Sequence, residues 1–150
     1  MPVAVSQFSG EALQRSGVQD LFQLQTSAPS LIVNQEQSAS NTAFGIRGVF
    51  TSSQNLGLES SVGLYVDGVY RARQGSMINN MVDIQSIEIL RGPQGTLFGR
   101  NTPAGAVQIN SVAPDHDNSG FLELTAGNYN LWNANGAASF SAIEDELAFR

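Results

Sequence analysis

The densest cluster of side chains that could recognise a ligand lies at residues 70–74, Tyr70-Arg71-Ala72-Arg73-Gln74. Its two guanidinium groups stand out in a chain whose net charge is −6. Arginine binds carboxylate, phosphate or catecholate oxygen through paired hydrogen bonds, and tyrosine adds an aromatic face with a hydroxyl. We therefore predict that Tyr70, Arg71, Arg73 and Gln74 contact an anionic ligand. The alternative is that these side chains only support the surrounding fold.

Residues for other kinds of chemistry do not combine into a site. Asp115-His116-Asp117 contains the only histidine, but it lies in a polar linker and is expected to be a solvated tract. No G-x-S-x-G motif presents a hydrolase nucleophile. The glycines at 92, 95 and 99 fit neither G-x-x-x-x-G-K-[ST] nor G-x-G-x-x-G, the patterns that bind phosphate. The sequence therefore predicts no catalytic residue, no metal site and no cofactor.

The glycine-rich stretch at residues 89–109, ILRGPQGTLFGRNTPAGAVQI, predicts a strand, a tight helical turn and a second strand. Isoleucine and leucine favour a strand up to Leu90, and Pro93 suits the first position of a short helix. Asn101 is a typical turn residue, and Val107-Gln108-Ile109 alternates like a strand with one buried face. Four glycines are expected to be structural, either stopping the turn or letting backbone pack closely: Gly92, Gly95, Gly99 and Gly105. Local physics alone does not exclude the alternative that this stretch is a generic glycine-rich connection in a soluble domain.

The same stretch resembles the plug-domain signature of TonB-dependent outer-membrane receptors. The resemblance extends in family order to residues 2–33, to FGIRG at 44–48, to GLYVDGVY at 63–70 and to the segment 120–140. It implies an α+β plug domain, with a small mixed sheet and short helices, followed by the first antiparallel strands of a transmembrane β-barrel. That barrel would close with roughly 22 strands around the plug.

The resemblance also implies roles for two arginines, each of which follows a strand and precedes a glycine. Arg47 and Arg91 would face the barrel wall and pair with its carboxylates inside an enclosed lumen, as a plug-to-barrel lock. A charge in such a place must be paired, because leaving it buried alone is costly. Without the resemblance, two exposed arginines are the simpler interpretation. The loop that contains Tyr70 to Gln74 would look outward, towards the ligand.

Composition narrows the class of protein further. A length of 150 residues fits one domain, or one domain and a fragment. Seven basic residues against thirteen acidic ones argue against a nucleic-acid partner. The absence of cysteine excludes disulfides and thiolate metal sites. No apolar run approaches the ~18 residues of a membrane-spanning helix, and no signal-peptide pattern is present.

The remaining segments predict short elements and linkers. The expected strands, helices and irregular segments are, in chain order: a strand at 3–5, a helix from Ser9 to Gln14 or Arg15 with Gly17 as its stop, a helix from near Asp20 to Pro29, a strand at 31–33, a polar loop at 34–42, a strand at 44–46, a polar loop at 50–60, an alternating strand at 62–66 with a tight turn at Asp67-Gly68, an irregular or weakly helical segment at 71–82 and a linker at 111–119.

After the linker the pattern changes to strands with alternating apolar and polar residues. Leu122 and Leu124 alternate with Glu123, and the apolar positions from Trp132 to Phe140 alternate with Asn and Ser. Trp132 and Phe140 would stand about 27 Å apart along a strand; tilted by ~40°, this spans roughly 20 Å, near the ~25 Å apolar band between the aromatic girdles of a barrel. An ordinary amphipathic hairpin of a soluble protein fits the same pattern.

We therefore predict a plug domain at residues 1–117 and a truncated start of an outer-membrane β-barrel at 118–150, both cut from a longer protein. The implied function is TonB-dependent active import of a ligand across the Gram-negative outer membrane. A ferric siderophore is the favoured ligand, and cobalamin or a glycan are the alternatives. The implied partners are TonB with ExbB and ExbD, through a box missing from this chain. The alternative is a free plug-like periplasmic module that binds a ligand or signals.

Overall fold

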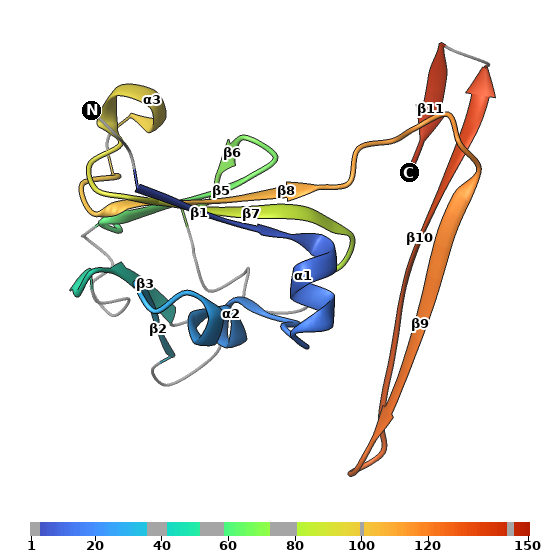
Figure 1. Cartoon of the computed structure of the whole chain (residues 1–150), viewed down its shortest axis with the longest axis horizontal. Helices are drawn as coiled ribbons and strands as arrows, with labels where there is room; N and C mark the ends of the chain where they lie inside the picture. The colour runs from blue at the N-terminus through green and yellow to red at the C-terminus, as the bar shows by residue number, and fades with distance from the viewer. Residues whose placement is uncertain (1–3, 36–41, 52–58, 73–80, 100, 144–145) are drawn as a thin grey trace. The chain divides into compact units, whose positions relative to one another are not determined.

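The computed structural model describes residues 4–35, 42–51, 59–72, 81–99, 101–143 and 146–150 (Figure 1). The chain divides into two compact units, Met1–Ser111 and Val112–Arg150. The predicted domain boundary between residues 117 and 118 lies in the segment after the first unit and stays a prediction.

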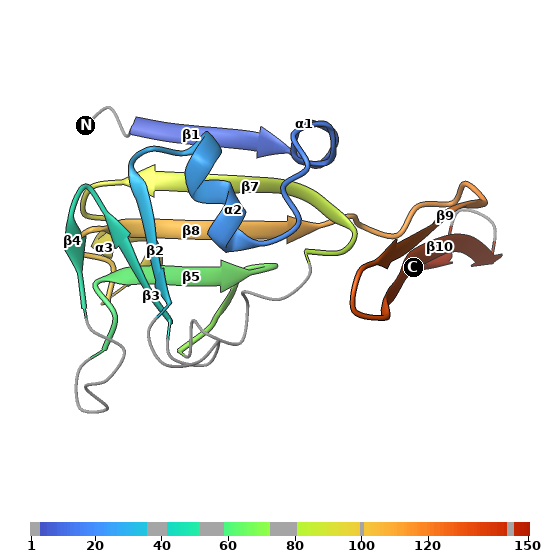
Figure 2. The same cartoon turned by 90° about the horizontal axis from the view of Figure 1, so that it is seen from below.

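The first unit is built on a mixed five-stranded sheet, seen from its face in Figure 2. Its order is β1-β7-β8-β5-β6, with β5 and β8 parallel and the other pairs antiparallel. The strands are β1 (Ala4–Ser9), β5 (Val62–Val66), β6 (Val69–Tyr70), β7 (Ile84–Arg91) and β8 (Gly105–Ser111). β8 is the central strand of this sheet, and it pairs with β7 on one side and with β5 on the other.

One face of this sheet is covered by two short helices and a second, three-stranded sheet (Figure 1). These elements are α1 (Gly10–Arg15), α2 (Leu21–Ser27), β2 (Leu31–Gln35), β3 (Thr42–Ile46) and β4 (Val49–Phe50). The core between the layers is apolar, and its largest fully buried side chains include Leu21, Leu24, Phe44, Ile46, Ile87, Ile89, Val107 and Ile109. Burying such side chains is the main favourable term of folding, so this layer stabilises the sheet.

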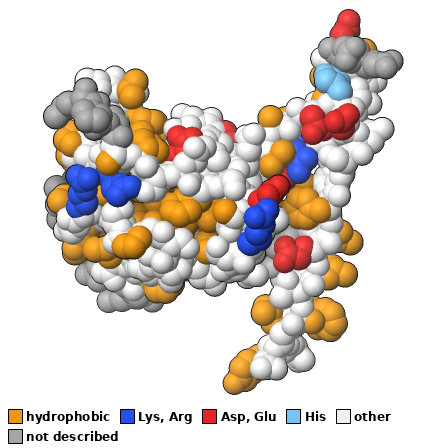
Figure 3. All heavy atoms as spheres, viewed as in Figure 1, with side chains coloured by type: hydrophobic (Ala, Val, Ile, Leu, Met, Phe, Trp, Pro, Cys, Tyr) orange, Lys and Arg blue, Asp and Glu red, His pale blue; other side chains and the backbone are white. Residues whose placement is uncertain are grey.

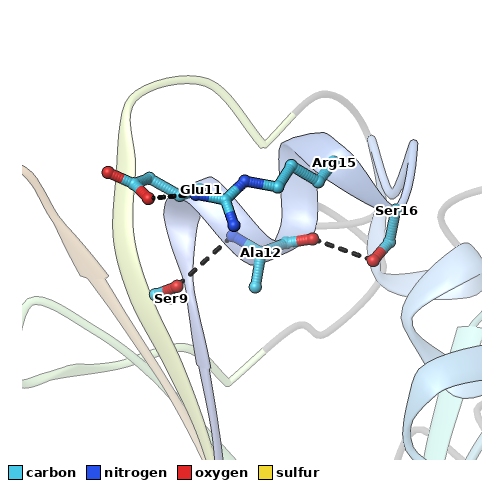
Figure 4. A network of polar contacts seen from close by, with 5 residues as sticks. All are labelled: Ser9, Glu11, Ala12, Arg15 and Ser16. Carbon is cyan, nitrogen blue, oxygen red and sulfur yellow. Dashed lines mark hydrogen bonds and ion pairs between the residues drawn. The ribbon is translucent and has the colours of Figure 1, made fainter.

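Both helices begin at the residues that the sequence predicts. The Ser9 hydroxyl accepts a hydrogen bond from the Ala12 amide at 3.3 Å (Figure 4), and the Asp20 carboxylate accepts one from the Gln23 amide at 2.6 Å. Each bond satisfies an amide that has no partner within its helix. Arg15 pairs with Glu11 at 2.7 Å along α1, but both side chains are largely exposed and the pair adds little stability.

The other face of the sheet carries only the short helix α3 (Gly95–Phe98) and the β6 hairpin among the described elements of this unit (Figure 1). A second, smaller cluster lies there, formed by Tyr65, Leu90 and Ala106 with Tyr70 and Phe98 packed against it. As a result β5, expected from the sequence as an alternating strand, is buried on both faces from Val62 to Tyr65. The predicted α+β architecture of a small mixed sheet with short helices is confirmed.

Three local predictions need correction. Pro93 precedes α3 instead of starting it, because Gln94 stands at the N-cap and the helix begins at Gly95. The predicted loop at 34–42 is shorter, since Asn34, Gln35 and Thr42 pair between β2 and β3. Phe50, expected in a loop, pairs with Gly45. Residues 36–41 and 52–58 of those two loops, and residues 73–80, lie outside the described residues.

The second unit is an antiparallel sheet in the order β11-β10-β9. Its strands are β9 (Ser119–Gly127), β10 (Leu131–Ile143) and β11 (Leu147–Phe149). In β10 the apolar positions predicted from the sequence are exposed, while Asn133, Asn135 and Ser139 are more covered. No described helix in either unit has the length and hydropathy to cross a membrane.

Candidate functional site

The glycine-rich segment between β7 and β8 folds into a closed turn. The Gly92 amide donates to the Ala104 carbonyl at 3.0 Å, and the Gln94 amide donates to the Thr102 carbonyl at 3.1 Å. The Ala104 amide in turn donates to the Ser61 carbonyl at 3.0 Å, which ties the turn to the start of β5. These bonds fix the base of the turn against the central strands.

Three of the four predicted structural glycines have a backbone that favours glycine. Their φ angles are +94° at Gly92, +74° at Gly99 and +150° at Gly105. Gly105 is also crowded, since a Cβ there would come within 2.3 Å of the Leu90 carbonyl oxygen. Gly95 shows neither feature, because its φ is not positive and an added Cβ would meet nothing within 4 Å. Its predicted structural role therefore has no support in the described geometry.

Tyr65 contacts the α3 end of this turn at Phe98, a role that the sequence analysis missed. Its hydroxyl donates to the Phe98 carbonyl at 2.6 Å, and its ring lies 4.8 Å from the Phe98 ring and 5.5 Å from the Tyr70 ring between centroids. Burial, and to a smaller degree the neighbouring Tyr70, raises the pKa of the Tyr65 phenol above 10.0. The hydroxyl therefore stays a proton donor at neutral pH.

Two sequence signals point to Tyr65 once the fold is known. The Asp67-Gly68 turn sets Tyr65 opposite Tyr70 across the hairpin. Gly63 makes room for the ring, since a Cβ there would lie 2.7 Å from a Tyr65 ring carbon. Aromatic residues opposite one another in an antiparallel pair commonly stabilise it.

Arg47 and Arg91, far apart in the sequence, come to the same end of the first unit. Gly105 faces Arg91 across the β7–β8 pair, and a Cβ on Gly105 would meet Ile46 Cδ1 at 2.7 Å, one residue before Arg47. Figure 3 shows basic side chains gathered at the left-hand end of this unit, where β7 ends and β8 begins in Figure 1. The pairing of Gly105 with Arg91 and its packing against Ile46 therefore bring the two arginine positions to one end of the unit.

Neither of these arginines pairs with an acidic side chain among the described residues. Arg91 donates to the Ser6 hydroxyl on β1, while its Nε is buried and has no hydrogen-bond partner in the described part of the chain. Arg47 is exposed, with φ +55° in the turn after β3. An unpartnered guanidinium nitrogen is consistent with an acceptor outside these residues, and the predicted pairing with barrel carboxylates stays a prediction.

The Asp67 carboxylate fastens the β5–β6 turn to the end of β8. It accepts the Ser111 amide at 2.8 Å and the Ser111 hydroxyl at 3.0 Å, while the Asp67 amide donates to the Ile109 carbonyl at 2.9 Å. Because Ser111 is the last residue of the first unit, this clamp fixes where the chain leaves the mixed sheet.

The structure places the four predicted ligand-contact residues in different surroundings. Tyr70 is half-buried against Tyr65, so its ring supports the fold. Arg71 is exposed, and its amide donates to the Leu64 carbonyl at 2.8 Å. Arg73 and Gln74 lie outside the described residues. Only the Arg71 side chain is therefore seen in a position to meet a ligand.

The Asp115-His116-Asp117 tract is exposed, and His116 Nδ1 lies 3.1 Å from the Ser141 hydroxyl of β10. Among the described residues no group of three or more histidine, cysteine, aspartate or glutamate side chains could hold a metal ion.

Comparison with known proteins decides the family. Residues 1–106 match the model of the TonB-dependent receptor plug domain. The chain belongs to this family of receptor plugs. It is 34% identical over 115 residues to the pesticin receptor of Yersinia pestis, an alignment that covers 77% of this chain. It is 26% identical over 133 residues to the ferrioxamine B receptor of Salmonella typhimurium, covering 86% of this chain.

The structural comparison agrees with this family. The crystal structure of the ferric yersiniabactin uptake receptor FyuA from Yersinia pestis superposes with a TM-score of 0.82, at 29% identity, over 93% of this chain and 22% of the receptor. The chain spans only 17% of the length of the pesticin receptor and 18% of that of the ferrioxamine B receptor. Membership of the family places the chain in the outer membrane, as a plug inside the barrel of a receptor.

Proposed function

We propose that this chain is the gating plug of a receptor that imports a ferric siderophore across the outer membrane in a TonB-dependent step. The carrying observation is the plug match over residues 1–106, together with relatives that are named as receptors for ferrioxamine, yersiniabactin and other siderophores. No catalytic role is included in this proposal.

The geometry of the plug suits a gate that stays closed until another protein applies energy to it. The closed turn at 92–104 and the clamp between Asp67 and Ser111 fix both ends of β8. These bonds hold the sheet together as one body, and the sequence carries no nucleotide-binding pattern that would let the plug use ATP itself. We propose that TonB, with ExbB and ExbD, supplies this energy through a box upstream of the plug domain.

The second unit favours a barrel over a free periplasmic module. Leu122, Leu124 and Trp132 are 73%, 71% and 80% exposed. The register sets Leu124 opposite Ala134 and Leu122 opposite Gly136, so that apolar residues of both strands share one face. Strands with an apolar outer face and a polar inner face are the building units of outer-membrane barrels.

Growth of a deletion strain tests the import proposal. The strain, starved of iron, receives the full-length receptor gene or an empty vector and is fed single ferric siderophores, with cobalamin and oligosaccharides as other classes of nutrient. We expect growth on one or a few siderophores, and no growth when TonB is also deleted. Receptor-dependent growth on cobalamin or a glycan alone would reject the siderophore, and growth without TonB would reject the energy source.

A ligand-binding measurement extends this test to the predicted contacts. The variants Arg71→Ala and Arg73→Ala of the full-length receptor, in detergent, should bind the identified siderophore more weakly, with a smaller loss of affinity between low and high salt. An unchanged affinity and salt slope would assign the ligand to other loops.

A further inference from the structure

The face of the five-stranded sheet opposite the main core is covered over only part of its area. Among the described elements of the plug, α3 and the β6 hairpin stand on this face, over Tyr65, Leu90 and Ala106 (Figure 1). Beyond these residues and the exposed Val5, which pairs with Leu90, the face is polar. This polar strip consists of Gln7 on β1, Ser86 and Glu88 on β7, and Gln108 and Asn110 on β8.

The strip is internally organised. Gln108 Nε2 donates to Asn110 Oδ1 at 3.0 Å, and Asn110 Nδ2 donates to the Ser86 hydroxyl at 3.1 Å. Such a chain of hydrogen bonds fixes the side chains that make it, because the central amide has one partner on either side. Glu88 lies in the middle of the strip, directly opposite Gln7 on one neighbouring strand and Gln108 on the other.

Glu88 is the single charged residue of the strip, and its side chain is half-buried by the plug alone. Its carboxylate forms no hydrogen bond or ion pair with another described residue. A neutral glutamine at this place would continue the amide chain with no charge to compensate. Water therefore solvates this half-exposed carboxylate in the plug alone, and a charged partner for it would have to come from outside the described residues.

The barrel that surrounds a plug of this family is the place where a partner for Glu88 can lie. A plug of this family sits inside a barrel, and this chain spans only 17% of the pesticin receptor, so most of a receptor of that kind lies outside the residues described. When a wall covers the strip, the Glu88 carboxylate loses the water that now solvates it. Covering a charge is costly unless an opposite charge and hydrogen bonds replace that water.

We propose that the polar strip docks against the barrel wall through an arginine or lysine that the wall presents to Glu88. The contact is opposite in sign to the predicted lock, in which Arg47 and Arg91 meet carboxylates of the wall. Arg91 reaches the Ser6 side of the sheet, whereas Glu88 faces the other side. The plug is thus oriented by a cationic end and an anionic face, and a rotated plug would set like charges together.

Chemical labelling of the full-length receptor tests this docking. The 150 residues contain no cysteine, so Glu88→Cys places one thiol in the plug. In outer membranes, a water-soluble maleimide should label this thiol at least tenfold more slowly than a thiol at the exposed Glu11. Labelling at equal rates would mean a water-filled passage, and protection that appears only with a siderophore would mean a ligand contact; either result overturns the proposal.

A charge test identifies the partner. Glu88→Gln should make the plug roughly tenfold more sensitive to protease in outer membranes, which corresponds to about 1.4 kcal/mol. Glu11→Gln is the matched control, because it removes the same charge from α1 and its partner Arg15 belongs to the plug itself. Suppressors of Glu88→Arg should replace a basic residue of the wall by an acidic one. Equal behaviour of the two Gln variants, or suppressors confined to other positions, would refute the pairing.

This inference rests on the proposed function only for the presence of the barrel. Labelling and protease sensitivity need no transport, so their outcome is independent of the ligand. A receptor that imports no siderophore but protects the thiol at position 88 would remove the proposed function and leave the docking in place.

Discussion

Replacing Gly105 by alanine should destabilise the plug more than any other single methyl group added to the glycine-rich turn. The new Cβ would lie 2.3 Å from the Leu90 carbonyl oxygen and 2.7 Å from Ile46 Cδ1. The carbonyl belongs to the β7 ladder and Ile46 is completely buried, so neither is free to move away. The backbone at φ +150° adds strain.

The magnitude follows from these two effects. A backbone conformation that an L-residue rarely adopts costs about 1–3 kcal/mol, and overpacking of a filled interior costs about 1–3 kcal/mol. Together they should lower the free energy of unfolding by about 2–6 kcal/mol, a large share of the ~5–15 kcal/mol typical of a domain. Such a loss would leave the plug partly unfolded at 37 °C.

Gly95→Ala is the matched control, since it adds the same methyl group in the same turn. Nothing lies within 4 Å of its Cβ position and its φ is not positive, so we expect a change between zero and about 1 kcal/mol of added stability. Gly99→Ala has open space but φ +74° with ψ −161°, a backbone region used almost only by glycine, and should cost about 1–3 kcal/mol from strain alone.

Urea denaturation of residues 1–113, followed by far-ultraviolet circular dichroism, measures all three variants. The single tryptophan, Trp132, is outside this segment, so tyrosine fluorescence provides the second probe. In the full-length receptor, hydrogen exchange of the β8 amides reports the same difference. If the Gly105 and Gly95 variants differ by less than about 1 kcal/mol, the close packing at Gly105 does not determine stability and the reasoning fails.

Three further predictions concern the rest of the chain. Below pH 10.0 the neutral Tyr65 contributes its full stability; this contribution is lost as pH rises through the raised pKa of the folded state, and Tyr65→Phe should abolish that alkaline loss in a series of melting curves. Arg47→Ala and Arg91→Ala should each leave a wall carboxylate unpaired at about 3–5 kcal/mol, and wild-type transport and protease resistance in both would reject the lock. Expressed alone, residues 1–150 should aggregate while 1–113 stays soluble, and a monomeric, cooperatively unfolding 1–150 would contradict this.

The parts of the fold that the sequence predicts well are those with local causes. Ser9 and Asp20 cap the two helices because a short side-chain oxygen reaches an amide two or three residues ahead. The turn at Asp67-Gly68 and the glycine at 99 depend on φ angles that few residues adopt. Each of these signals is complete within a few residues, so no knowledge of the fold is needed to interpret it.

The parts that the sequence does not predict depend on contacts between distant segments. Gly10 looks like an ordinary helix start, yet a Cβ there would lie 2.0 Å from the Ile84 carbonyl oxygen of β7. Tyr65 resembles any aromatic strand residue until its hydroxyl meets the Phe98 carbonyl. The placement of Arg47 and Arg91 at one end of the unit likewise requires the β7–β8 register and the packing of Ile46 against Gly105. Sequence spacing contains none of these distances.

The second unit shows how a pattern that is ambiguous in the sequence acquires a physical consequence in the structure. Alternation alone fits a soluble hairpin and a barrel strand equally. The register places Trp132 opposite Ala126 and Leu124 opposite Ala134, so one face of the β9–β10 pair is continuous apolar surface, with Trp132 80% exposed. Keeping such a surface in water forgoes about 25 cal/mol for every Å² that burial would remove. The first unit folds around its own core, whereas in the proposed barrel this hairpin would gain its stability from lipid on one face and from neighbouring strands at its edges.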